Sequence, residues 1–173
     1  HVPIQSANLP HGSQFTSIIL PDGYMLRVSL DDLPDFFHSL AVEDAMALRY
    51  QLGRCYSPQE LQCGGFVLST AQRKLSKLAL CLVALPMGSL HAVDFSQDYH
   101  EGLGVGDAKI DYDSLLHYGH PISRWCEGLK RLHHGLYIDD SGCVGVVPEH
   151  IAEGSTEDVD TVRMDLCERV YKQ

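Results

Sequence analysis

The sequence lacks any pair of cysteines at the CxxC spacing, which argues against a zinc ribbon or a redox dithiol. Its cysteines are scattered and are expected to be free thiols: Cys55, Cys63, Cys81, Cys126, Cys143 and Cys167. It also lacks an apolar run long enough to span a bilayer and the charged and apolar regions of a signal peptide. We therefore expect an intracellular protein, in the cytoplasm or the nucleus, with no membrane partner.

Positive charge is scarce as well. The chain has 13 Lys and Arg against 23 Asp and Glu, which gives a formal net charge of −10. Binding of nucleic acid relies heavily on Lys and Arg side chains that neutralise phosphates. This segment is therefore not expected to hold nucleic acid tightly by itself, and basic surfaces for that purpose would have to lie outside it.

The size of the chain indicates one globular unit, since 173 residues with 45% hydrophobic content can bury a core of ordinary size. The sequence begins with His1 and ends at Gln173 within a helix-like pattern, so we expect both ends to be cut from a longer protein. Residues 1–23 show little periodicity and several prolines, and are expected to be a linker or the remnant of an upstream subdomain.

Alternating apolar and polar residues predict a strand over residues 24–32. The alternation places Asp32 on the face of Val28 and Leu30, and Asp31 on the opposite face. Later patterns predict a helix over 42–52 ended by Gly53, a buried strand over 78–85, a helix over 90–103, a loop over 104–121, helical character over 123–132 and a helix over 155–171. This order predicts an α+β fold with helices covering one face of a sheet.

A hairpin is predicted near the C-terminal end. Residues 139–142 (DDSG) are typical of a tight turn, and short apolar strands flank them at 136–138 and 143–147. If the fold brings Asp139 and Asp140 to the pair Asp31 and Asp32, the carboxylates could hold divalent metal for phosphoryl or nucleotidyl transfer. Two plainer interpretations stay open, because DDSG satisfies turn geometry without any function and the earlier pair could simply end a strand.

Three segments, taken in order, resemble the palm of a reverse transcriptase (RNA-directed DNA polymerase) of the retroelement type. Residues 30–40 (LDDLPDFFHSL) are similar to the first catalytic motif of the family, in which an aromatic follows an Asp by five positions; this alignment selects Asp32 over Asp31. Residues 85–88 (LPMG), with Ala92 and Gln97 in the helix that follows, are similar to its LPxG motif. Residues 137–140 (YIDD) match its YxDD box.

The resemblance implies an antiparallel palm-type sheet with a catalytic β-hairpin and helices packed on one face, truncated at both ends, over residues 24–173. Residues 1–23 would then be a remnant of the fingers or a linker. Catalysis is implied for Asp32, Asp139 and Asp140, with two Mg²⁺ ions, replaceable by Mn²⁺, held by Asp32 and Asp139. Asp140 is expected to play a supporting role, because in a strand its side chain should face away from that of Asp139.

The resemblance also implies nucleotide-binding positions and partners. The backbone carbonyl of Leu33 would reach a metal, and the ring of Phe37 would pack under the sugar and exclude a 2′-hydroxyl, which favours DNA synthesis. Met87 stands where some members carry Gln, and Gly88 would let the backbone approach the nucleotide. The implied partners are an RNA or DNA template-primer and a dNTP, whereas Phe36 is expected to belong to the core.

The chain departs from the family at both ends. Neither a fingers motif with basic triphosphate-binding residues nor a thumb or RNase H segment is recognisable. The fragment alone is therefore expected to be inactive. Two alternatives remain: a decayed or domesticated, non-catalytic palm-like domain that binds a protein partner through its acidic face, and a metal-dependent phosphohydrolase that uses the same carboxylates.

Overall fold

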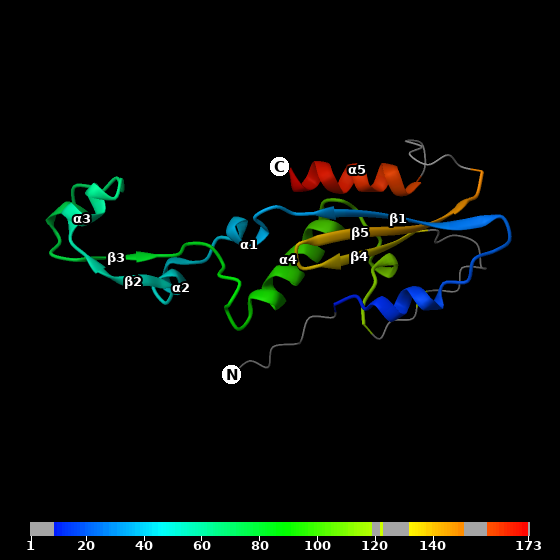
Figure 1. Cartoon of the computed structure of the whole chain (residues 1–173), viewed down its shortest axis with the longest axis horizontal. Helices are drawn as coiled ribbons and strands as arrows, with labels where there is room; N and C mark the ends of the chain where they lie inside the picture. The colour runs from blue at the N-terminus through cyan, green and yellow to red at the C-terminus, as the bar shows by residue number, and fades with distance from the viewer. Residues whose placement is uncertain (1–8, 119–121, 123–131, 151–158, 173) are drawn as a thin grey trace. The chain divides into compact units, whose positions relative to one another are not determined.

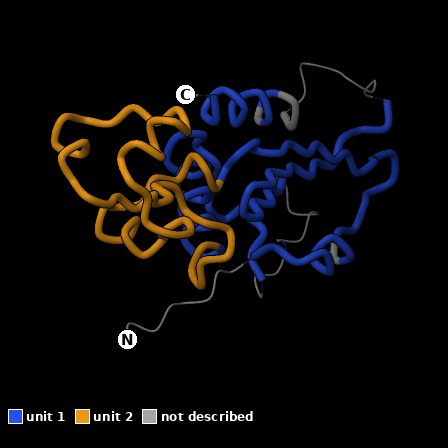
Figure 2. The backbone as a smooth tube through the Cα atoms, turned by 60° about the vertical axis from the view of Figure 1, so that its left-hand side comes forward, with its two compact units in different colours: residues 1–36, 93–173 blue, residues 37–92 orange. Residues whose placement is uncertain are grey.

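The computed structural model describes residues 9–118, 122, 132–150 and 159–172. The chain divides into two compact units, one formed by residues 1–36 with 93–173 and the other by residues 37–92 (Figure 2). The first unit holds a three-stranded antiparallel sheet and the second a two-stranded one, so the protein is of the α+β class that the sequence predicts. Within the described ranges, no helix has the length and apolar character needed to cross a bilayer.

The sheet of the first unit has the order β1-β5-β4 (Figure 1). Its strands are β1 (Tyr24–Asp32), β4 (Leu132–Tyr137) and β5 (Asp140–Pro148). Along β1, Val28 and Leu30 lie on the more exposed side, which confirms the predicted alternation. In β5 every residue from Ser141 to Val147 is buried, so the central strand forms the core of this unit.

Helices α4 (Ala92–Gly106) and α5 (Val159–Tyr171) complete the first unit. α5 packs on β1 and β5, and the end of α4 meets β4 through Leu136. The buried apolar cluster consists of Ala108, Ile110, Leu115, Leu136 and Cys167, with Val105, Val170 and Tyr171 packed against it. On the other face of the sheet lies the N-terminal 3-10 helix η1 (Gly12–Ser17) (Figure 1).

The predicted loop over 104–121 begins too early, because α4 continues through Gly104 to Gly106. Gly104 lies on the buried face of the helix, where an added Cβ would come 2.8 Å from Leu136 Cδ1 and 3.2 Å from Ile110 Cδ1. The glycine is therefore explained by close packing of a helix on a strand and not by a loop. A further 3-10 helix, η3 (Tyr112–Ser114), follows. Residues 123–131 of the predicted helical segment 123–132 lie outside the described residues. Residue 132 belongs to β4.

The second unit contains β2 (Gln51–Tyr56) paired antiparallel with β3 (Leu78–Cys81). Short helical segments accompany these strands: α1 (Phe36–Ser39), α2 (Asp44–Ala47), α3 (Pro58–Cys63) and η2 (Gln72–Lys74). α3 begins with a capping box in which Ser57 and Glu60 satisfy each other's backbone N–H groups. These elements account for the region in which the sequence shows mainly turn signals.

The predicted helix over 42–52 is wrong in its second half. α2 ends at Ala47, and Gln51 begins a strand that pairs with Cys81. The amide of Leu82 also donates to the carbonyl of Tyr50 at 3.0 Å. Pairing with a distant segment therefore overrides the local helical pattern, since helix propensity is a weak local preference.

Two glycines of α4 offer a test of this packing. Gly102 has no atom within 4 Å of an added Cβ, whereas Gly104 faces Leu136 and Ile110. Gly102→Ala is expected to raise the free energy of unfolding by about 1 kcal/mol, because Ala is the better helix former. Gly104→Ala gains the same preference but overpacks the contact at a cost of about 1–3 kcal/mol. Urea unfolding should show it to be clearly less stable than Gly102→Ala, and equal stabilities would contradict this packing.

Candidate functional site

The two acidic segments meet at one end of the three-stranded sheet. Asp32, the last residue of β1, pairs with Asp140, the first residue of β5. Asp140 also pairs with Tyr137, which leaves Ile138 and Asp139 as the two residues of the turn. The backbone amide of Leu33 donates to the carbonyl of Asp139 at 2.9 Å. The fold thus brings together residues that lie more than a hundred positions apart in the sequence.

The turn is shorter than predicted. The sequence places it at residues 139–142, but Ser141 and Gly142 pair with Asp31 and Leu30 of β1 and belong to β5. These residues have a partner strand on each side, because β4 pairs with the same positions. Turn residues can therefore be drawn into a ladder when both neighbouring strands extend far enough to pair with them.

Asp140 lies on the same sheet face as Asp32. Residues that stand directly opposite each other in an antiparallel pair project to one side, so the pair Asp32–Asp140 occupies the face of Val28 and Leu30, and Asp31 the face covered by α5. Asp140 therefore lies in β5 and not in the turn that the sequence predicts, whereas Asp139 does lie in the turn. The selection of Asp32 over Asp31 agrees with this placement.

The three carboxylates influence one another. Asp32 and Asp140 are exposed and Asp139 is partly buried. The pKa of Asp140 is raised above its ordinary value, first by partial desolvation and then by the negative charges of Asp139 and Asp32. A cation bound at this end of the sheet would relieve that repulsion.

The donor set fits Mg²⁺ or Mn²⁺, since both prefer carboxylate oxygen. In the part of the chain that the structure describes, no three His, Cys, Asp or Glu side chains already stand in a metal-binding arrangement. The carboxylates of Asp32 and Asp140 are exposed, and exposed side chains change rotamer readily. These residues, with Asp139, are therefore the ones that would hold an ion.

The turn has an unusual backbone. Ile138 has φ = +59°, a conformation that is a genuine outlier for a β-branched residue. Such strain costs of the order of 1–3 kcal/mol and persists only where surrounding contacts impose it. Those contacts come from the buried face of α4.

Gln97 of α4 binds backbone groups at the end of β4 and at the start of the turn. Its side-chain Nε2 donates to the carbonyl of Leu136 at 2.7 Å, and its Oε1 accepts from the amide of Ile138 at 2.8 Å. The same Nε2 lies 2.8 Å from Glu101 Oε1. Gln97 is only 1% exposed, so these bonds form away from water, where unsatisfied backbone groups are costly.

His100, one helical turn further along α4, is also buried. Its Nδ1 lies 2.8 Å from the carbonyl oxygen of Ile138, and its Nε2 lies 2.7 Å from the hydroxyl of Tyr171 on α5. Burial lowers the pKa of His100 and raises that of Tyr171, so both side chains are neutral near pH 7. A polar chain thus runs from α5 through α4 to the turn.

Sequence reasoning missed the roles of His100 and Tyr171 and gave Gln97 no function of its own. The signal was present in α4, whose buried positions at helical spacing include polar side chains where an ordinary amphipathic helix has apolar ones. Ser96, Gln97 and His100 are each at most 1% exposed. A polar stripe at core positions indicates that the partner element presents backbone groups to be bound.

The predicted nucleotide-binding residues are divided between the units. Leu33 belongs to the first unit with the aspartates, whereas Phe37, Met87 and Gly88 belong to the second. Phe37 is 8% exposed and therefore buried, while Met87 is 70% exposed. An added Cβ at Gly88 would meet no atom within 4 Å. Phe36, expected in the core, is buried and lies against the rings of Tyr99 and His100.

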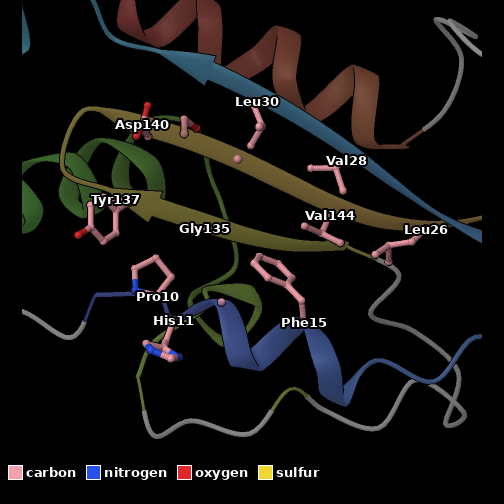
Figure 3. A pocket seen from close by; sticks show the side chains of 13 residues that line it. Pro10, His11, Phe15, Leu26, Val28, Leu30, Gly135, Tyr137, Asp140 and Val144 are labelled. Atoms are coloured by element: carbon pink, nitrogen blue, oxygen red, sulfur yellow. The ribbon is translucent and has the colours of Figure 1, made fainter.

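An apolar groove of about 540 Å³ lies on the sheet face that carries Asp140 (Figure 3). The ring of Phe15, from η1, faces the strands across this groove. The other lining residues are Pro10, His11, Gly12, Leu26, Val28, Leu30, Gly135, Tyr137, Asp140, Ser141, Gly142 and Val144. No Lys or Arg is among them, so the groove offers no cationic side chain to a phosphate.

Comparison with known proteins gives no match for this chain among family models, curated proteins or solved structures. No family is therefore established by similarity over the whole chain. Function has to be inferred from the motifs of the sequence and the geometry of the carboxylates.

The raised pKa of Asp140 predicts a pH-dependent stability. A carboxyl group whose pKa is higher in the folded protein favours folding at low pH, and this contribution is lost as the pH rises through the folded value. Asp140→Asn is therefore expected to stabilise the metal-free protein at pH 7 by a few tenths of a kcal/mol, because the groups are exposed and screened. The gain should vanish below the ordinary Asp value of 3.8.

Asp98→Asn, at an exposed position of α4, is the matched control and should leave the free energy of unfolding within about 0.5 kcal/mol. Urea unfolding at several pH values measures both variants. A loss of stability in Asp140→Asn at pH 7 would show that the three carboxylates do not repel one another. High salt should reduce the gain, because the charges are at the surface.

Proposed function

We propose that this chain is the palm portion of an RNA-directed DNA polymerase, which joins a primer 3′-hydroxyl to a deoxynucleotide. The observation that carries the proposal is the pairing of Asp32 with Asp140, together with the contact of Leu33 with Asp139. These contacts bring Asp32 beside residues 137–140, as the resemblance to a palm would require.

In this proposal Asp32 and Asp139 hold two Mg²⁺ ions. The ions would supply Lewis-acid activation of the 3′-hydroxyl and charge neutralisation at the triphosphate. Asp140, on the face of Asp32, adds negative charge that favours cation binding. The chain itself contributes mainly position, because the hairpin and the end of β1 hold the carboxylates at fixed places on a paired backbone.

The family resemblance would assign nucleotide contacts to Leu33, Phe37, Met87 and Gly88. Leu33 follows Asp32 directly and would offer its backbone carbonyl, while Gly88 would allow close approach of the backbone. Phe37, which is buried in its own unit, would exclude a 2′-hydroxyl and so select dNTP. Met87, which is exposed, lacks the amide that some members of the family offer.

The isolated chain is proposed to have no polymerase activity. Its net charge is −10, and the groove beside the carboxylates is lined by apolar side chains. Template and primer phosphates would need basic partners from other segments. Within a longer protein, those segments would bind the RNA or DNA template-primer and this one would supply the carboxylates.

A non-catalytic protein-interaction domain is the second candidate. The observation that favours it is the apolar face formed by Leu26, Val28 and Leu30, which are 36%, 52% and 80% exposed. Exposed apolar surface of this kind is common at protein interfaces. The two candidates differ in their need for metal.

Metal binding is the first test. Titration of the chain with Mn²⁺ is expected to raise its melting temperature, because a ligand that binds only the folded state adds about 2.7 kcal/mol of stability at a concentration 100 times its Kd. Asp32→Asn and Asp139→Asn should each remove most of this increase, while Asp98→Asn should keep it. An increase that is the same in all four proteins would exclude these carboxylates as metal ligands and favour the non-catalytic domain.

Polymerisation is the second test. In a protein that joins this segment to nucleic-acid-binding fingers and thumb, Asp139→Asn is expected to lower primer extension with dNTP and Mg²⁺ by more than about 100-fold, since even indirect partners of metal ligands contribute 10- to 100-fold. Thermal unfolding should change little, because Asp139 lies in the two-residue turn and is only partly buried. Retained extension would remove Asp139 from the mechanism.

A further inference from the structure

The two peptide groups that flank Ile138 are both held by α4. The peptide before Ile138 donates its N–H to Gln97 Oε1 at 2.8 Å, and the peptide after it presents its carbonyl to His100 Nδ1 at 2.8 Å. The second of these peptides is the one that links Ile138 to Asp139. Its orientation sets the backbone from which the Asp139 side chain projects, because a planar peptide has no freedom of its own.

The partners of His100 define its protonation. A carbonyl oxygen only accepts, so Nδ1 must carry the proton that is shared with Ile138. In the neutral ring Nε2 is then an acceptor, and it receives the hydroxyl proton of Tyr171 at a distance of 2.7 Å. The carbonyl of Ile138 therefore defines the tautomer of His100, and Tyr171 completes the arrangement by donating to the other ring nitrogen, just as a partner on the far nitrogen orients a ligating histidine in metal sites.

We propose that His100 and Tyr171 are positioning residues of the carboxylate site. Tyr171 stabilises and orients the Nδ1–H form of His100 by donating to Nε2, and His100 holds the Ile138–Asp139 peptide so that Asp139 stays oriented for metal. The inference rests on the proposed function for its metal, while its structural part stands on the contacts alone. It assigns a role to α5, which contributes no carboxylate to the site.

The strained turn explains why such a clamp is needed. Ile138 at φ = +59° would relax to an ordinary conformation if its two peptide groups were released. His100 is 0% exposed and Gln97 is 1% exposed, so water cannot easily replace either partner. The rings of Phe36 and Tyr171 pack on His100 at centroid distances of 5.6 Å and 5.1 Å, which holds the imidazole in place.

A matched pair of variants separates the hydrogen bond from the packing. The side-chain nitrogen of Asn takes about the place of Nδ1 in His, whereas that of Gln takes about the place of Nε2. His100→Asn therefore keeps a donor for Ile138 and His100→Gln does not, while both lose the aromatic ring. Tyr171→Phe removes only the hydroxyl that donates to Nε2 of His100, and Tyr99→Phe, at a 50% exposed position of α4, is its control.

The probe is Mn²⁺, titrated into the full chain and followed by electron paramagnetic resonance. We expect the Kd for Mn²⁺ to rise about tenfold in His100→Gln, the lower end of the range found when partners of metal ligands are lost. In Tyr171→Phe, which acts one step further away, the rise should be about threefold. His100→Asn and Tyr99→Phe should stay within about twofold of the original chain. Circular dichroism confirms that each variant is folded.

Nuclear magnetic resonance without metal gives the second readout. The nitrogen shifts of His100 should report the Nδ1–H tautomer, and the shift of Nε2 should change in Tyr171→Phe, because its hydrogen-bond donor is removed. Exchange of the Ile138 amide should become about tenfold faster in His100→Gln than in His100→Asn, because the turn opens more often. These measurements decide the positioning role even if the chain binds no Mn²⁺, a result that would defeat the proposed function alone.

Three results would overturn the inference. One is a His100 ring in the other tautomer. Another is equal amide exchange in His100→Asn and His100→Gln, which would leave only a packing role for the ring. The third is Mn²⁺ binding by the original chain that His100→Gln leaves unchanged, because the held peptide would then have no influence on the carboxylates.

Discussion

The antiparallel pairing of β1 with β5 is the constraint on which the candidate site depends. It sets Asp32 opposite Asp140 and brings Leu33 to the carbonyl of Asp139. A shift of one residue in this register would turn every side chain of β1 to the other face, and Asp31 would replace Asp32 beside the turn. The alternation of exposed and partly buried residues along β1 opposes such a shift, because its two faces would have to be exchanged. The core of the unit and the geometry of the carboxylates therefore have a common origin.

The second feature is the use of polar side chains in the core of α4. Gln97 and His100 occupy buried positions, yet they bind backbone groups of the hairpin and do not leave them unsatisfied. Their contacts hold Ile138 in a backbone conformation that the residue would not adopt alone. Asp139 in the turn and Asp140 next to it repel each other electrostatically. This part of the hairpin gains its order from the helices behind it.

Local patterns predicted the first unit better than the second. The alternation of β1, the existence of the hairpin and the helices at 92–106 and 159–171 follow from periodicity and are present. The helix expected over 42–52 gives way to β2, whose partner β3 lies far along the chain. The sequence predicts a loop at Gly104, because the contact that explains this glycine is the close approach of Leu136. That contact lies outside any local stretch of the sequence. Errors thus fall where a distant segment decides the conformation.

The sequence by itself determined which chemistry is available. It supplies the acidic pairs, the order of the three motifs, the strand alternation that separates Asp31 from Asp32, and a charge of −10 that disfavours the binding of phosphates. Only the tertiary structure decided that Asp140 shares the face of Asp32, that the turn consists of Ile138 and Asp139, and that His100 and Tyr171 stand behind it. The reason is physical: periodicity is a local property of the chain, whereas register and hydrogen bonding between distant residues are fixed by packing the elements together.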